Sequence, residues 1–95
     1  MADAPAVVDN EGANRLEVSV NGRVASLAYR QEGDRLVLVH THVPDELEGH
    51  GLGGMLVAAA IDRARQQRLT VVPRCPFARG WLERHPDVAR RVSIE

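Results

Sequence analysis

Glu48-Gly49-His50-Gly51-Leu52-Gly53-Gly54, EGHGLGG, separates a half of the chain rich in strand patterns from a half that alternates helix and strand. It places four glycines in six positions, directly before an expected helix. The first backbone N–H groups of a helix lack partners within the helix, and the helix dipole favours negative charge there. Glycines let a bulky anion approach that backbone closely. The segment therefore predicts a cradle for a phosphate or pyrophosphate group, and it is also compatible with a tight turn and close packing.

The segments on either side of the glycines have clear periodicities. The helix that follows is expected to end near Arg68, and one wide arc of it is apolar, formed by Leu52, Leu56, Val57, Ala60, Ile61 and Ala64. The segment Arg35–Val43 before the glycines alternates with a period of two. Its two expected faces are Leu36, Leu38, His40 and His42 on one side and Val37, Val39, Thr41 and Val43 on the other. Since both faces carry apolar residues, we expect a central strand that is covered on both sides.

The remaining segments complete an α+β domain. Alternating apolar residues from Leu16 to Val20 predict a strand, and Asn21-Gly22 is a strong hairpin signal before a second strand over 23–30. Leu69–Pro73 predicts a fourth strand, joined to the third by a right-handed helical crossover. Short helices are expected over 76–85 and 87–93. The predicted fold is a three-strand antiparallel meander, a helix crossover to a fourth, parallel strand, and short C-terminal helices. Residues 14–95 form this domain, and residues 1–13 are expected to be a flexible tail.

Composition excludes several classes of function. With 95 residues, the chain has room for one domain. All twelve basic residues are arginine, so a Schiff-base lysine and a Walker-type nucleotide site are excluded. A net charge of −1 and only three aromatic residues argue against nucleic-acid or membrane partners. The first residues lack the pattern of a secretion signal, and no apolar run is long enough to span a membrane, so we expect a cytoplasmic protein.

A lone cysteine and three histidines are the candidates for chemistry. Cys75 follows the fourth expected strand and precedes a helix, where a thiol pKa can be lowered, although a buried packing role is the common alternative. His40, His42 and His50 suggest zinc, but nothing in their spacing requires a metal, and we predict none. Trp81 and Phe77 are expected to lie in the core, because the apolar side of a short helix must be buried.

Three ordered motifs resemble the small YjdJ-type branch of the GNAT superfamily of acetyl-CoA-dependent N-acetyltransferases. They are His40-Thr41-His42-Val43-Pro44, then Leu47-Glu48-Gly49-His50-Gly51-Leu52-Gly53, then Val72-Pro73-Arg74-Cys75-Pro76-Phe77. The resemblance spans about Arg15 to Pro86. It implies that the strand ending near Val43 splays from the Leu69–Pro73 strand, and that acetyl-CoA is the co-substrate.

The resemblance also implies particular binding residues. Backbone groups of Thr41, His42 and Val43 would pair with the pantetheine arm. The CoA pyrophosphate would be cradled by the amides of Gly49, His50, Gly51, Leu52, Gly53 and Gly54. Cys75 would lie beside the thioester. Two departures from the superfamily stand out: Glu48 occupies the Gln/Arg position of the pyrophosphate pattern, and Leu82 occupies the position of a tyrosine general acid.

Acetyl transfer to an amine needs a polarised carbonyl, a deprotonated amine and a proton for the leaving thiolate. The catalytic candidates are His40 or His42 as a base, and Cys75 as an acid or a transient acetyl carrier. The predicted function is therefore acetyl transfer from acetyl-CoA to an amine on a small molecule or a protein. The alternative is a CoA-binding module with little or no turnover. The sequence specifies neither the acceptor nor the oligomeric state.

Overall fold

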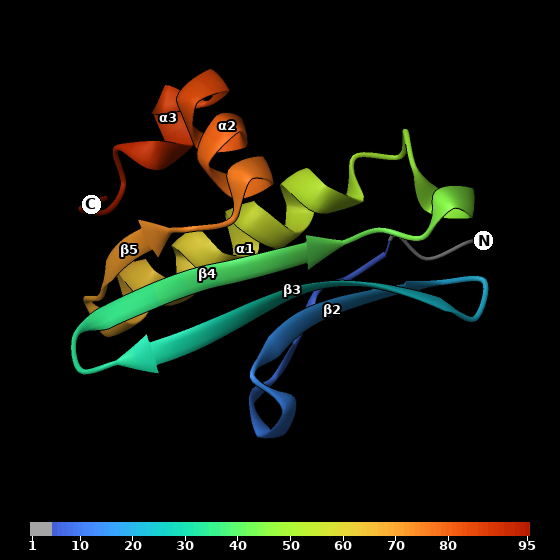
Figure 1. Cartoon of the computed structure of the whole chain (residues 1–95), viewed down its shortest axis with the longest axis horizontal. Helices are drawn as coiled ribbons and strands as arrows, with labels where there is room; N and C mark the ends of the chain where they lie inside the picture. Colours follow the sequence, from blue (N-terminus) through green and yellow to red (C-terminus); the bar gives the residue numbers. More distant parts are fainter. Residues whose placement is uncertain (1–4) are drawn as a thin grey trace.

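The computed structural model describes residues 5–95, which form one mixed sheet and three α-helices (Figure 1). The strands are β1 (Val8–Asn10), β2 (Arg15–Val20), β3 (Arg23–Glu32), β4 (Arg35–His42) and β5 (Thr70–Pro73). The α-helices are α1 (Leu52–Gln67), α2 (Pro76–Arg84) and α3 (Pro86–Ala89), and the 3-10 helices are η1 (Glu11–Ala13) and η2 (Asp45–Leu47). The sheet order is β1-β2-β3-β4-β5, antiparallel except for β5, which runs parallel to β4. The α+β meander and crossover predicted from the sequence are thus confirmed.

The segment expected to be a flexible tail is ordered from residue 8 onward, so that expectation was wrong there. Strand β1 pairs antiparallel with β2, and η1 joins the two. The anchor is Asp9: its carboxylate accepts a 2.6 Å hydrogen bond from the Tyr29 hydroxyl and forms an ion pair with Arg63 on α1. Tyr29 and Arg63 are 20 and 54 residues away in the chain, and no local pattern reveals such partners. Residues 1–4 of the expected tail lie outside the described residues.

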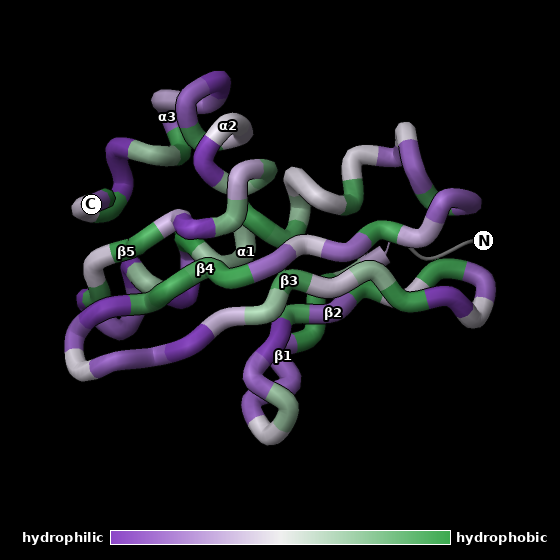
Figure 2. Tube along the Cα trace, in the orientation of Figure 1, coloured by the Kyte–Doolittle hydropathy of each residue, from purple (hydrophilic) through white to green (hydrophobic). Residues whose placement is uncertain are grey.

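One face of the sheet packs against α1 and α2 around a single core. All six residues of the predicted apolar arc of α1 are buried. On the strands, the core is formed by alternate side chains such as Leu16, Leu27 and Leu36, and α2 adds Ala78 and Leu82. The middle of β4 is strongly hydrophobic, whereas the turn between β3 and β4 is hydrophilic (Figure 2). Among residues 5–95, no helix is both long and apolar enough to cross a membrane.

A β-bulge in β4 determines which side chains face the helices. Tyr29 pairs with Leu38, but the preceding residue, Ala28, pairs with His40, so Val39 is an extra residue in β4. The extra residue reverses the alternation: Leu38 faces the core before the bulge, and Thr41, opposite the buried Leu27, faces the helices after it. The expectation that Leu36, Leu38, His40 and His42 share one face was therefore wrong. It assumed an unbroken period of two.

The same bulge limits how far β4 is covered. Leu36, Val37 and Leu38 are buried, so the first half of β4 is central and covered on both faces, as expected. Beyond the bulge, the strand is more open, and Val39 is 42% exposed. The C-terminal half of β4 is thus available to line a binding site.

Candidate active site

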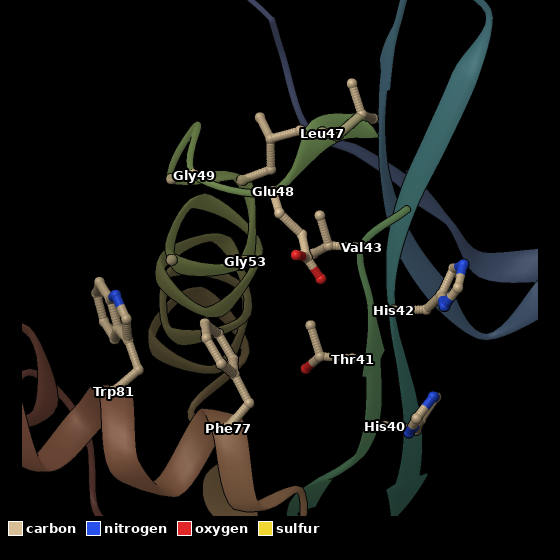
Figure 3. A pocket seen from close by; sticks show the side chains of 13 residues that line it. His40, Thr41, His42, Val43, Leu47, Glu48, Gly49, Gly53, Phe77 and Trp81 are labelled. Carbon is tan, nitrogen blue, oxygen red and sulfur yellow. The ribbon is translucent and has the colours of Figure 1, made fainter. Parts of the chain in front are cut away.

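A cleft of about 590 Å³ lies between the C-terminal half of β4, the glycine-rich segment, the start of α1 and the side of α2 (Figure 3). Its volume falls within the range of roughly 300–1,000 Å³ that is usual for small-molecule sites. It is lined by His40, Thr41, His42, Val43, Leu47, Glu48, Gly49, Gly51, Leu52, Gly53, Gly54, Phe77 and Trp81. Most of the residues that the sequence assigned to CoA binding thus meet in one cleft; His50 does not line it.

The parallel strands β4 and β5 separate at the inner end of the cleft. Their pairing runs from Arg35 with Thr70 to Leu38 with Pro73. The carbonyl of Leu38 then accepts hydrogen bonds from the N–H groups of both Arg74 (3.1 Å) and Cys75 (2.9 Å). Beyond this point the chain leaves β5 and enters α2, while β4 continues to His42. Among residues 5–95, no strand pairs with this edge of β4 past Leu38.

The backbone at the start of α1 presents unpaired donors. Gly51 is the N-cap with φ of 74°, a left-handed conformation that favours glycine, and its carbonyl accepts the N–H of Met55 (3.1 Å). No side chain within residues 5–95 caps this helix start. The N–H groups of Leu52, Gly53 and Gly54 precede the first donor within the helix. This is the open amide geometry that an anion requires.

The last two glycines of the segment have a packing role as well. A Cβ atom on Gly53 would lie 2.6 Å from Cζ of Phe77, and one on Gly54 would lie 2.5 Å from Nε1 of Trp81. The absence of side chains at these positions therefore allows α2 to bring its aromatic residues onto the first turn of α1. Gly49 and Gly51 instead have positive φ and open space around them. Gly53 and Gly54 thus combine free amides with a packing role, whereas Gly49 and Gly51 leave open space beside the backbone.

Phe77 and Trp81 were expected in the core, and the structure corrects this for Phe77, whereas Trp81 packs against the core while remaining partly exposed. Phe77 is 42% exposed, Trp81 is partly buried, and both line the cleft. The core side of α2 is formed by the small Ala78 and by Leu82. The spacing in the sequence already separates the two pairs. Residues 77 and 81 lie one helical turn apart, on a line of the helix surface next to the one that carries Ala78 and Leu82.

The histidines do not face the interior of the cleft. In Figure 3, the rings of His40 and His42 point away from it, on the opposite side of β4 from Thr41 and Val43. Their ring nitrogens are therefore poorly placed to act as a base in the cleft, although both residues border it. Among residues 5–95, no group of three His, Cys, Asp or Glu residues could hold a metal ion.

Cys75 is buried directly behind the cleft wall. It is the N-cap residue of α2, and its side chain is only 3% exposed. Its Sγ atom lies 3.1 Å from Oγ1 of Thr41, a residue that does line the cleft. The thiol can thus exchange a proton with a group in the cleft by way of the Thr41 hydroxyl.

Glu48 projects its carboxylate into the cleft (Figure 3). Within residues 5–95, none of the arginines forms a salt bridge with it. A carboxylate here would be tolerated beside a diphosphate if it pointed outward or paired with an arginine, and the described part of the chain shows neither. The residue is exposed to solvent, which screens its charge.

A mixed sheet whose parallel pair opens beside a glycine-rich helix start defines an acetyltransferase of the GNAT type. The chain belongs to the GCN5-related N-acetyl-transferase family, whose model matches residues 15–92. It is also similar to the NMR solution structure of a GCN5-like protein from Staphylococcus aureus, with 28% sequence identity and a TM-score of 0.71. That similarity covers 95% of this chain and 90% of the other. The membership in the GNAT superfamily that the three motifs indicated, and the acetyltransferase class that it implied, are confirmed.

Proposed function

We propose that this protein transfers an acetyl group from acetyl-CoA to the nitrogen of an amine. The proposal is carried by one observation: the uncapped amides at the start of α1 open onto a cleft that leads to the unpaired edge of β4. An anion cradle connected to an exposed strand edge suits a ligand with a diphosphate in its middle and an amide-containing arm. CoA has both features.

In this proposal, the amides of residues 49–54 bind the pyrophosphate, and the pantetheine arm lies along Thr41, His42 and Val43. Gly51 has no atoms within 4 Å of the position its Cβ would take, so there is room for the phosphates to approach. The arm would pair with the backbone of β4 past Leu38, where β5 has turned away. The thioester would then lie near Thr41, at the inner end of the cleft.

The chemistry is a direct attack. The amine gives its extra proton to water, its lone pair attacks the thioester carbonyl carbon, and the carbon–sulfur bond breaks. Backbone N–H groups on the free edge of β4 stabilise the developing oxyanion. As the carbon–sulfur bond breaks, the CoA sulfur takes a proton from the Thr41 hydroxyl while the Cys75 thiol passes its own proton to Thr41 across their 3.1 Å contact. The nitrogen, positively charged after the attack, loses its second proton to water, and a proton from water returns through Thr41 to restore the Cys75 thiol before the next turnover. The Cys75 sulfur is buried, so it is poorly placed to attack the thioester itself. In this proposal it only supplies a proton, and no acetyl-cysteine intermediate forms.

A second candidate function is binding of CoA with little or no turnover. Two observations favour it. Leu82, at the position of the superfamily's tyrosine acid, is buried in the core and carries no proton to donate. The Glu48 carboxylate also opposes a polyanion in the cleft.

Isothermal titration with acetyl-CoA tests binding, and release of free thiol with a mixed panel of amines tests turnover. We expect Gly51→Glu to abolish binding, because it fills the cradle with a side chain and a negative charge. Gly22→Glu is the matched control: Gly22 has a φ of 77°, close to the 74° of Gly51, but lies in the β2–β3 turn. Equal affinity in both variants would refute the placement of the pyrophosphate. Tight binding without thiol release would select the second candidate.

The acceptor is proposed only as an amine, on a small molecule or on a protein. The cytoplasmic location expected from the sequence stays a prediction.

A further inference from the structure

The cleft extends in a second direction from the amide cradle, away from β4. Across the view of Figure 3, Thr41 lies on one side, Phe77 lies near Gly53 in the middle, and Trp81 lies on the other side. A pyrophosphate held at the start of α1 has two substituents, which must leave in different directions. If the pantetheine arm follows β4, the nucleoside end of the ligand leaves toward Trp81.

The indole of Trp81 is held in place. The His85 ring stacks on one of its faces, with ring centroids 3.9 Å apart and an angle of 12° between the planes. The Nδ1 atom of His85 also lies 2.8 Å from the carbonyl oxygen of Trp81, which fixes the orientation of the histidine ring. Nε1 is the indole atom nearest to the Cβ position of Gly54, so this edge lies against the first turn of α1. The indole nevertheless remains only partly buried, and it lines the cleft.

The same side of α2 carries a positive charge one turn further on. Phe77, Gly80, Trp81 and Arg84 have the i, i+3, i+4 and i+7 spacing of one helix face. The Arg84 guanidinium folds back over Gly80: its Nη1 atom lies 3.2 Å from the position that a Gly80 Cβ would occupy. Within residues 5–95, Arg84 forms no salt bridge. A flat aromatic group next to a cation is thus positioned beyond the phosphate cradle.

We propose that Trp81 and Arg84 bind the adenosine 3′-phosphate end of CoA, the indole stacking on the adenine and the guanidinium pairing with the 3′-phosphate. Stacking on an aromatic side chain is the common way in which proteins hold an unpaired base. A guanidinium is well suited to phosphate because of its planar, bidentate geometry. The inference rests on the proposed function, and it deepens it by assigning the half of the ligand that the glycine-rich segment does not explain.

Three ligands separate the parts of this site: CoA, dephospho-CoA, which lacks the 3′-phosphate, and 4′-phosphopantetheine, which lacks the whole adenosine half together with the phosphate attached to it. We expect titration calorimetry to show affinity decreasing in that order. Trp81→Leu should weaken CoA by about tenfold, in the range of base–aromatic stacking, and leave 4′-phosphopantetheine nearly unchanged. Arg84→Gln should remove the preference for CoA over dephospho-CoA, since charge-assisted contacts to phosphate are lost. Arg79→Gln, on the same helix but lining a different cavity, is the matched control.

Fluorescence gives an independent readout, because Trp81 is the only tryptophan of the chain. CoA and dephospho-CoA should quench its emission, and 4′-phosphopantetheine should not. Trp81→Phe preserves an aromatic ring on Gly54, so it serves as the binding variant if Trp81→Leu is poorly folded by circular dichroism; we expect it to retain most of the affinity.

Two negative results have different meanings. If 4′-phosphopantetheine binds as tightly as CoA, or if CoA binds without changing the Trp81 emission, the adenosine site is wrong and the proposed acetyltransferase function stands. If none of the three ligands binds, the proposed function fails together with this inference.

Discussion

Replacing Gly53 with alanine tests whether the absence of a side chain at this position determines both the packing of Phe77 on α1 and the shape of the cleft. Gly53 is buried and lies at the second position of α1. An alanine Cβ would lie 2.6 Å from Cζ and 2.8 Å from Cε2 of Phe77. Carbon atoms in contact prefer about 3.5–4.0 Å, so the ring must move by roughly 1 Å. Because Phe77 is 42% exposed, the ring can move more easily than the helices can separate.

Two effects on stability then oppose each other. Alanine is favoured over glycine in a helix by up to ~1 kcal/mol, and less in the first turn. Displacing the ring from its preferred rotamer costs about 0.5–1.5 kcal/mol. We therefore expect the free energy of unfolding of Gly53→Ala, measured with urea, to stay within about 1 kcal/mol of the wild type. Since α1 blocks one side, the ring moves into the cleft, and the affinity for acetyl-CoA should fall by about tenfold, or ~1.4 kcal/mol.

The double variant Gly53→Ala/Phe77→Ala decides the cause. With the ring absent, the alanine at 53 should stabilise the protein by about 0.5–1 kcal/mol relative to Phe77→Ala alone, and it should cause no further loss of binding. Gly80→Ala is the control in α2 for the unfolding measurement alone, since only the flexible end of Arg84 would be contacted. A loss of 2 kcal/mol or more in Gly53→Ala that persists in the double variant would refute the reasoning, as would unchanged affinity for acetyl-CoA.

Three further predictions follow from the site and from the N-terminal anchor. Glu48→Gln should tighten acetyl-CoA binding about fivefold, because a carboxylate in the cleft opposes a diphosphate by on the order of 1 kcal/mol in water. The gain in calorimetry should shrink in high salt, and no gain at low salt would contradict the prediction. Cys75→Ser, which keeps a proton donor beside Thr41, should retain more thiol-release activity than Cys75→Ala, while both bind acetyl-CoA like the wild type; equal rates in the two variants would remove Cys75 from the relay. Burial, aided by the hydrogen bond to Asp9, raises the pKa of Tyr29 to about 12. Because the raised pKa favours the neutral form in the folded state, the stability that this group contributes should be present below pH ~10 and lost as the pH rises toward 12. Urea unfolding of Tyr29→Phe should lack this loss, and ultraviolet titration of the wild type, which has a single tyrosine, should show the raised pKa directly.

The sequence predicted the elements well because their signals are local. The apolar arc of α1, the Asn21-Gly22 hairpin and the parallel crossover all depend on residues that are close in the chain. Strand β1 was missed because its anchor is distant: Asp9 acquires its partners, Tyr29 and Arg63, only when the chain is folded. Three residues with one apolar side chain carry too little pattern to predict an edge strand.

The sequence predicted where the backbone amides of the candidate site lie, but not how the side chains of the site are oriented. The positions of the amides of α1 follow from the glycine spacing, and the structure places them on the cleft. The orientation of His40 and His42 depends instead on one extra residue, Val39, that no periodicity reveals. The exposure of Phe77 and Trp81 depends likewise on the absence of side chains at two glycines in another helix.

These observations connect the bulge to the function of the fold. A regular β4 would turn the Thr41 side chain away from the helices and put histidine rings in the cleft, beside the proposed thioester. The extra residue instead faces Thr41 toward Cys75, at 3.1 Å, and it lies one residue beyond Leu38, where the pairing with β5 ends. Strands that remained paired to His42 would leave no free backbone edge for the pantetheine arm. The single extra residue thus reverses which β4 side chains face the helices, at the point where the sheet opens between β4 and β5. Deletion of Val39 should therefore disrupt both the contact between Thr41 and Cys75 and the free backbone edge of β4.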